Sequence, residues 1–336
     1  MVNRIGKYTI GFGDGIGIHS YASVAGEKEA NGPIGNKFHK IIYDSKAGKA
    51  TFEQAESEFQ REALMLAMSR GELTACDIDF IFSGDLLNQC ISSSFGLKGF
   101  SIPYFGLYGA CSTMALGLIL GSITISSGAA NLCACVTSSH FGAAERQYRF
   151  PLEYGGQRTP TAQWTVTAAG CCILSSCAKG KPRISAATVG RIADKGVTDA
   201  NNMGAAMAPA AAQTLCDFFR DTNSAPEDFD HIYTGDLGFV GSDIFRTLAL
   251  QEGFDVKNNH TDCGTIIFSR DEQDVHAGGS GCGCAASTLC SHILSSFENT
   301  KGKRILFMPT GALMSPTSAG QGLTIPAVAH LVEITN

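Results

Sequence analysis

The 336-residue sequence lacks several patterns that would assign it quickly to a class of protein. None of its 13 cysteines forms a Cys-x-x-Cys pair, so the spacing typical of zinc and iron-sulfur sites is missing. Glycines alternate from Gly11 to Gly17, but without the Gly-x-Gly-x-x-Gly order of a dinucleotide-binding turn. We therefore expect no metal centre and give a nucleotide cofactor little weight.

Charge is also scarce, because charged residues make up 17% of the chain and the net charge is −6. This balance leaves no basic surface for nucleic acid or for an anionic membrane. The first ten residues contain no continuous apolar segment, so we expect no secretory signal, and the scattered cysteines predict reduced thiols in a cytosol-like compartment. A hydrophobic content of 44% is typical of a globular protein with a substantial core.

The stretch from Pro103 to His140 has no charged residue, yet glycines and serines interrupt it too often for a membrane span. It predicts a buried strand at Tyr104–Tyr108 and then a buried helix, with Cys111 at the junction. Since a helix N-terminus favours a thiolate, we expect a lowered pKa for Cys111. Such a junction builds either a cysteine nucleophile or an anion-binding pocket, and the residues alone leave both open.

A ten-residue pattern occurs twice, at Asp77–Leu86 and at Asp228–Leu237, with six of ten positions identical. The first copy follows an apolar spacing that predicts a helix at Phe52–Arg70, and the second follows a helical segment expected at Pro209–Arg220. Each copy precedes a glycine-led apolar helix and another strand. The chain is therefore predicted to consist of two related α/β halves, residues 1–179 and 180–336, with the two apolar helices at the centre.

Ligands in such folds gather at the carboxyl ends of strands and at helix N-termini. We therefore expect Asp85, Cys111, Asp236 and the loop Gly278–Cys284 to lie near one another.

A polar loop at residues 145–165 connects the halves and interleaves arginines with aromatic residues. One interpretation is a solvated surface loop. Its many aromatic and amide residues favour instead an ordered loop, in which guanidinium groups pair with carboxylates and flat rings stack on flat ligands. The loop thus predicts an aromatic or carboxylated ligand.

The duplicated halves, with Cys111 at the head of a buried helix, resemble the thiolase and ketoacyl synthase superfamily. Within it, the chain resembles the stage V sporulation protein AD family over nearly its whole length. The segments that carry this closer resemblance are Gly84–Gln89, Leu107–Ser112, Glu153–Arg158, Pro160–Thr165 and Asp274–Gly283.

This resemblance implies a thiolase-like fold of five layers, α-β-α-β-α, and a role in endospore formation. It further implies binding of dipicolinic acid (pyridine-2,6-dicarboxylic acid), free or as its calcium chelate, for uptake into the developing spore and release in germination. Other proteins of the stage V sporulation A operon would hold the soluble chain peripherally at the spore inner membrane. No cofactor is implied apart from calcium within the chelate.

Comparison with the superfamily's condensing enzymes tests whether catalysis survives. Asp236 stands where they place a histidine or asparagine, and a carboxylate there would repel a developing oxyanion. His276 and Gly279 do match their His-x-x-Gly pattern. The resemblance therefore implies vestigial Cys111 and His276 and no catalysis. The alternatives are an active acyltransferase that forms a thioester on Cys111, and a scaffold for other operon products.

The resemblance also implies a homodimer that pairs through Tyr104–Tyr108. The residues expected to meet the ligand are Cys111, Ser112, His276, Gly279, Arg146, Arg149, Arg158, Gln157, Gln163, Asp85 and Asp236.

Overall fold

The structure is a computed structural model that describes residues 2–148, 158–176, 180–297, 300 and 302–336. The main strands of the first half are β2 (Thr9–Gly26), β4 (Phe80–Gly84), β5 (Tyr104–Gly106), β6 (Leu132–Ser139) and β8 (Ala168–Ser175). Those of the second half are β9 (Arg183–Thr188), β10 (His231–Gly235), β11 (His260–Asp262), β13 (Arg304–Ala312) and β15 (Leu331–Thr335). The shorter strands are β1 (Asn3–Ile5), β3 (Lys40–Ile42), β7 (Trp164–Thr165), β12 (Gly279–Ser280) and β14 (Ala327–Ala329).

The main strands follow one hydrogen-bonded path, β11-β10-β13-β15-β9-β2-β8-β6-β4-β5. If the five main strands of each half are numbered 1 to 5 in chain order, both halves have the strand order 3-2-4-5-1, counted from the outer edge of the sheet. The first strands of the two halves, β2 and β9, pair antiparallel where the halves meet. The two halves thus repeat one topology. Whether they are separate domains with a boundary at residue 179 stays a prediction.

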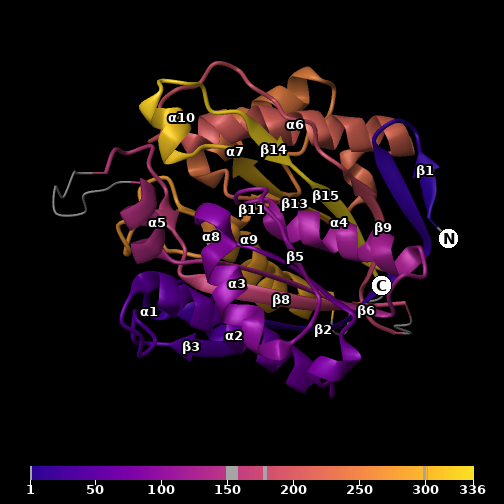
Figure 1. Cartoon of the computed structure of the whole chain (residues 1–336). Coiled ribbons are helices and arrows are strands. Elements are labelled where there is room, and N and C mark those ends of the chain that lie inside the picture. The colour runs from indigo at the N-terminus through magenta and orange to yellow at the C-terminus, as the bar shows by residue number, and fades with distance from the viewer. Residues whose placement is uncertain (1, 149–157, 177–179, 298–299, 301) are drawn as a thin grey trace.

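Helices cover both faces of each strand set and form three of the five layers (Figure 1). The helices that form these layers are α2 (Phe52–Arg70), α3 (Ile91–Leu97), α4 (Thr113–Ser126), α6 (Met203–Thr222), α7 (Gly238–Gln251) and α9 (Cys282–Thr288). The other α-helices are α1 (Glu27–Ala30), α5 (Phe141–Tyr148), α8 (Cys263–Ile266) and α10 (Pro316–Gly320). Because α4 and α9 contact strands of both halves, they form the central layer, with α2 and α3 outside one set and α6 and α7 outside the other. This arrangement confirms the predicted five-layered α/β fold.

The repeated ten-residue pattern has the same structural role in both halves. Asp79 accepts hydrogen bonds from the backbone N–H of Leu132, at the start of β6, and of the residue before it. Asp230 likewise accepts a 2.7 Å hydrogen bond from the backbone N–H of Arg304, at the start of β13. The repeated aspartates therefore join the second strand of each half to the fourth where both begin.

Two local predictions are wrong. The strand at Tyr104–Tyr108 is not buried: β5 is the last strand of the path, and Phe105 is 48% exposed. An apolar run predicts packing on one face, here Phe105 stacked on Phe82, but cannot tell an edge strand from a central one. The second wrong prediction took Pro209 as the first residue of a helix. The helix, α6, begins instead at Met203 and contains Pro209 within it.

Within the described residues, no helix is both long and apolar enough to cross a lipid bilayer. Every cysteine that the structure describes carries a free thiol.

Candidate functional site

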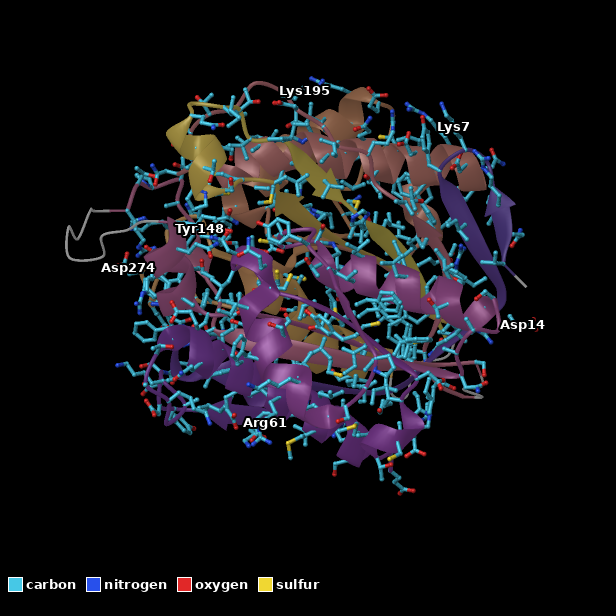
Figure 2. All side chains as sticks on the ribbon, in the orientation of Figure 1. Lys7, Asp14, Arg61, Tyr148, Lys195 and Asp274 are labelled. Carbon is cyan, nitrogen blue, oxygen red and sulfur yellow. The ribbon has the colours of Figure 1, made fainter. Side chains whose placement is uncertain are left out.

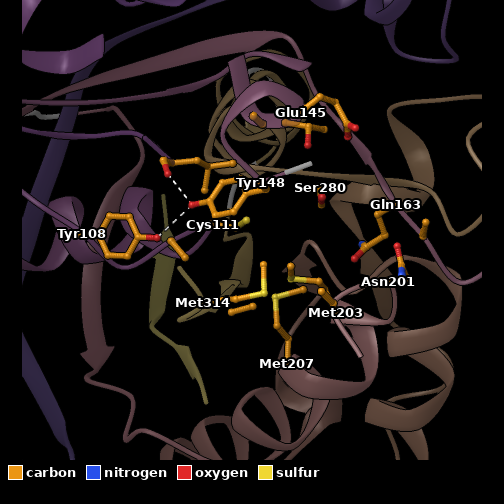
Figure 3. A pocket seen from close by; sticks show the side chains of 17 residues that line it. Tyr108, Cys111, Glu145, Tyr148, Gln163, Asn201, Met203, Met207, Ser280 and Met314 are labelled. Carbon is orange, nitrogen blue, oxygen red and sulfur yellow. Dashed lines mark hydrogen bonds between the residues drawn. The ribbon is translucent and has the colours of Figure 1, made fainter. Parts of the chain in front are cut away.

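A cavity of about 450 Å³ is lined by residues of both halves and reaches Cys111 at the head of α4. Its volume is typical of small-molecule sites, which occupy roughly 300–1,000 Å³. Figure 3 shows Met203, Met207 and Met314 gathered on one side of it, with Gln163 and Asn201 beside one another. The other lining residues are Leu86, Tyr108, Ala110, Ala144, Glu145, Tyr148, Ala162, Thr165, Ala200, Ser280 and Ala312.

Tyr148 on α5 is held in place in the cavity wall by its hydroxyl group. The hydroxyl donates a 2.7 Å hydrogen bond to the carbonyl oxygen of Leu86, and the Tyr108 hydroxyl lies 3.4 Å from it (Figure 3). Both rings therefore offer fixed aromatic surfaces to a ligand.

Cys111 is a buried thiol, two residues before the first residue of α4. Burial raises its pKa well above the ordinary value, and the nearby carboxyl group of Asp236 raises it further. The backbone N–H groups of Gly281 and of Cys111 itself oppose this shift only in part. The predicted lowering of the Cys111 pKa is therefore wrong, because loss of solvent outweighs the helix dipole.

Asp236 is fully buried directly after β10, in a left-handed backbone conformation with φ of +74°. Neither of its carboxyl oxygens has a hydrogen-bond partner among the described residues. Burial, and next the neighbouring Asp262, raise its pKa well above the ordinary value, while the nearby Gly281 N–H and Cys284 thiol, neither of which reaches hydrogen-bond geometry, offset this only in part. Burial thus favours the protonated forms of both the Asp236 carboxyl group and the nearby Cys111 thiol.

Asp85 occupies the equivalent position after β4 but differs in its environment. Its carboxylate accepts hydrogen bonds from the backbone N–H of Leu87 at 2.9 Å, and from the Ser93 N–H and hydroxyl at 2.8 and 2.6 Å. It is not among the residues that line the cavity, where Leu86 takes its place. Asp236, but not Asp85, contributes to the raised pKa of Cys111, whereas Cys111 and both aspartates raise the pKa of Cys282 in the glycine-rich loop.

Gln163 lies between the cavity and the glycine-rich loop. Its Nε2 donates hydrogen bonds to the carbonyl oxygens of Asp236 at 2.7 Å and of Gly279 at 3.2 Å. Its Oε1 is buried and has no hydrogen-bond partner among the described residues. The amide therefore presents a fixed, unpaired acceptor at a residue that lines the cavity.

His276 and Arg158 lie outside the cavity lining and share the partner Asp274. The His276 Nε2 lies 3.1 Å from one carboxylate oxygen of Asp274, and its Nδ1 lies 2.8 Å from the Thr159 carbonyl oxygen. Arg158 contacts the carbonyl and carboxylate oxygens of Asp274 and lies over the Trp164 ring. Figure 2 shows Asp274 at the surface, outward of Tyr148.

Other expected ligand residues also have local roles. Arg146 faces Glu53 at 3.6 Å with its side chain half exposed, and the Ser112 hydroxyl donates to the carbonyl oxygen of Gly109. Arg149 and Gln157 lie outside the described residues. Of the expected set, the structure places Cys111 and Gln163 in the cavity lining.

Sequence reasoning missed the methionine wall and Asn201. Met203 and Met207 are four residues apart, which places them on one face of a helix, but this signal requires a helix that begins before Pro209. Met314 comes from a distant segment after β13, and only the fold brings it to the other two.

The fold and the buried thiol at the head of the central helix define a thiolase-like protein. Solved structures of OleA from Xanthomonas campestris share this fold. An acetamide-bound form has a TM-score of 0.65 at 12% identity, with 100% of both chains covered. A cerulenin-bound co-crystal has a TM-score of 0.62 at 14% identity and covers 96% of this chain and 97% of that one.

The chain belongs to the stage V sporulation protein AD family, whose sequence profile matches residues 6–335. Stage V sporulation protein AD of Bacillus subtilis (strain 168) is 41% identical over 325 residues, which are 97% of this chain and 96% of the relative. Membership in this family supports a role in sporulation.

Proposed function

We propose that this protein is a non-catalytic binding protein for dipicolinic acid, free or as its calcium chelate. It would act in uptake of the compound into the developing endospore and in its release during germination. The observation that carries the proposal is the burial of Cys111 and Asp236 at the head of α4, which raises the pKa of both groups. A thiol with a raised pKa is a weak nucleophile, and a nearby carboxyl group with a raised pKa does not favour its thiolate form, which supports binding over covalent catalysis.

The cavity lining suits a flat aromatic diacid. A pyridine ring can lie against the thioethers of Met203, Met207 and Met314, which favour aromatic contacts by about 0.3–1.5 kcal/mol each. Hydrogen-bond donors for carboxylate oxygens come from the Asn201 amide and the Ser280 hydroxyl, both in the lining.

The remaining expectations concern partners and place. We propose peripheral attachment to the spore inner membrane through other products of the stage V sporulation A operon. We further propose a homodimer through β5, supported by its position at the edge of the sheet and by the exposure of Tyr104 and Phe105.

Isothermal titration with dipicolinate in a chelator-containing buffer tests the binding function. We expect saturable binding, and an affinity lowered about two- to tenfold in Asn201→Ala, since a net hydrogen bond contributes about 0.5–1.5 kcal/mol. Arg146→Ala is the matched control, because that side chain faces Glu53. Absence of saturable binding, with and without calcium, would refute the proposal.

An active acyltransferase remains the second candidate, favoured by the access that the cavity gives to Cys111. Mass spectrometry after incubation with acyl-CoA distinguishes the two. The binding proposal expects no adduct on Cys111, whereas stoichiometric acylation that Cys111→Ser abolishes would establish the enzyme instead.

A further inference from the structure

We propose that Lys37, Tyr233, His292 and Lys303 form an anion site that binds a phosphate group, either free or as the headgroup of a lipid. These residues come from four separate segments and from both halves of the chain. None of them lines the cavity beside Cys111, so the inference goes beyond the proposed function and does not depend on it. The net charge of −6 does not reveal this cluster, because its members lie far apart in the sequence.

The cluster is arranged around His292. This residue belongs to the π-helical turn Leu289–Ile293, which directly follows α9, and such turns are rare and recur at functional sites. Lys37 ends a 3₁₀ turn of the first half, and its ammonium nitrogen lies 2.6 Å from His292 Nδ1. Tyr233 comes from β10, with its ring centroid 6.4 Å from that of the imidazole, and Lys303 directly precedes β13.

The first argument is the set of donors without acceptors. An ammonium group can only donate, so His292 Nδ1 accepts from Lys37 and the ring proton lies on Nε2. Among the residues that the structure describes, none accepts a hydrogen bond from this Nε2–H or from the Tyr233 hydroxyl, although Tyr233 is only 7% exposed. Neither atom is sealed in the interior, so a ligand can reach both.

The tyrosine and the lysines retain their protons for such a ligand. Burial raises the pKa of Tyr233 to about 12, so its hydroxyl is a donor at neutral pH. Lys37 donates to His292, and Lys303 donates a 2.8 Å hydrogen bond to the Ser296 hydroxyl. Since an ammonium group has three N–H donors, each lysine has others left for an anion.

The second argument is positive charge without a counter-charge. In the described part of the chain, neither Lys37 nor Lys303 forms an ion pair with a carboxylate. Burial lowers the pKa of His292 to about 4, and the basic neighbours Lys37, His231 and Lys303 lower it further. The pKa of His231 is likewise lowered by burial and next by Lys303. Two ammonium groups therefore face imidazoles that stay neutral, and a bound anion would supply the opposite charge.

The chemistry of the donors favours phosphate over a carboxylate. A phosphate ester carries about −1.5 to −2 charges at pH 7 and three strong acceptor oxygens, which point in different directions. It can thus accept from donors that approach from separate segments. Lysine binds phosphate as a compact charge, while a neutral imidazole and a phenol each add one directed donor. A carboxylate has two oxygens in one plane and would leave more of these donors unpaired.

Isothermal titration of the full chain with inorganic phosphate, against chloride of matched ionic strength, tests the site. We expect saturable binding that weakens at least about fivefold in Lys37→Gln and in Lys303→Gln, because each removes a charged donor. Tyr233→Phe keeps the ring and removes the hydroxyl, so it should weaken binding about two- to tenfold without lowering the melting temperature. Lys195→Gln is the matched control, since Lys195 is an exposed lysine outside the cluster (Figure 2), and it should bind phosphate as the wild type does.

Cosedimentation with vesicles distinguishes the two sources of phosphate. Retention on phosphatidylcholine vesicles that contain phosphatidic acid, lost without the phosphatidic acid and reduced in Lys37→Gln, would assign a lipid headgroup. Phosphate binding without such retention would assign a free phosphate. Absence of saturable phosphate binding, acetate binding as tight as that of phosphate, or equal affinities in Lys37→Gln and Lys195→Gln would overturn the site.

Discussion

Asp236→Asn is expected to stabilise the protein increasingly as pH rises. Burial and Asp262 hold the native pKa of Asp236 well above that of an aspartate in the unfolded chain, which is about 3.9. Between these two pKa values the native state binds one proton more than the unfolded state, so the free energy of unfolding falls as pH rises. The loss amounts to about 1.4 kcal/mol per pH unit while the native acid stays neutral.

Asparagine has nearly the same shape as aspartate and does not titrate, so the variant does not lose this unfolding free energy as pH rises. Between pH 5 and pH 7 the difference in unfolding free energy between the variant and the wild type should widen by about 2–3 kcal/mol in favour of the variant. Urea denaturation at pH 5, 6 and 7 measures it, with matched ionic strength. A difference that stays constant over this range would show that Asp236 is ionised in the native state and would refute the reasoning.

Asp85→Asn is the control from the equivalent position of the first half. Because the Asp85 carboxylate accepts three hydrogen bonds, replacing one of its oxygens with an N–H donor should destabilise the protein by about 1–3 kcal/mol already at pH 5. The change in the free energy of unfolding should thus be stabilising for Asp236→Asn and destabilising for Asp85→Asn.

Three further changes test other parts of the structure. Alkylation of Cys111 by iodoacetamide at pH 8 should be slow and should change little in Asp236→Asn, because burial is the largest cause of the raised thiol pKa; a rate equal to that of an exposed cysteine would contradict the assigned cause. Phe105→Glu should shift the protein to monomers in sedimentation velocity, since it places charge on the exposed edge strand; an unaltered dimer would exclude pairing through β5. Gly281→Ala should lower stability by about 1–3 kcal/mol in thermal melts, because φ is +113° and a Cβ would collide with the Ser139 hydroxyl; an unchanged melting temperature would contradict this.

The sequence predicted the parts of this fold that depend on local periodicity and on repetition. The helix Phe52–Arg70 follows from apolar spacing and matches α2 at both ends. The repeated Asp77–Leu86 and Asp228–Leu237 patterns predicted two strands in equivalent places, because aspartates such as Asp79 have the same hydrogen-bonding role in each copy.

The chemistry of the site was less predictable because it depends on contacts between distant segments. Arg158, one of the three arginines expected to meet a ligand, contacts Asp274, 116 residues away. The pKa of Cys111 depends on burial and on Asp236, and neither can be read from the local motif. A motif thus identified where the thiol stands, but not its protonation.

The two Gly-Asp-Leu turns differ in their hydrogen bonds, and this difference explains why Asp85 is paired whereas Asp236 is not. In the first half, the backbone N–H of Leu87 donates to Asp85. The equivalent N–H in the second half, that of Gly238, donates to Asp262 on β11 at 2.9 Å.

Asp262 also accepts from the Leu237 N–H and from the Thr234 hydroxyl, and through Gly238 it holds the backbone donor that corresponds to the one bound by Asp85. Asp236 is thereby left unpaired and buried near Cys111, where it raises the thiol pKa. Burial and, next, Asp262 at the end of β11 therefore raise the pKa of Asp236, although neither acid lines the cavity.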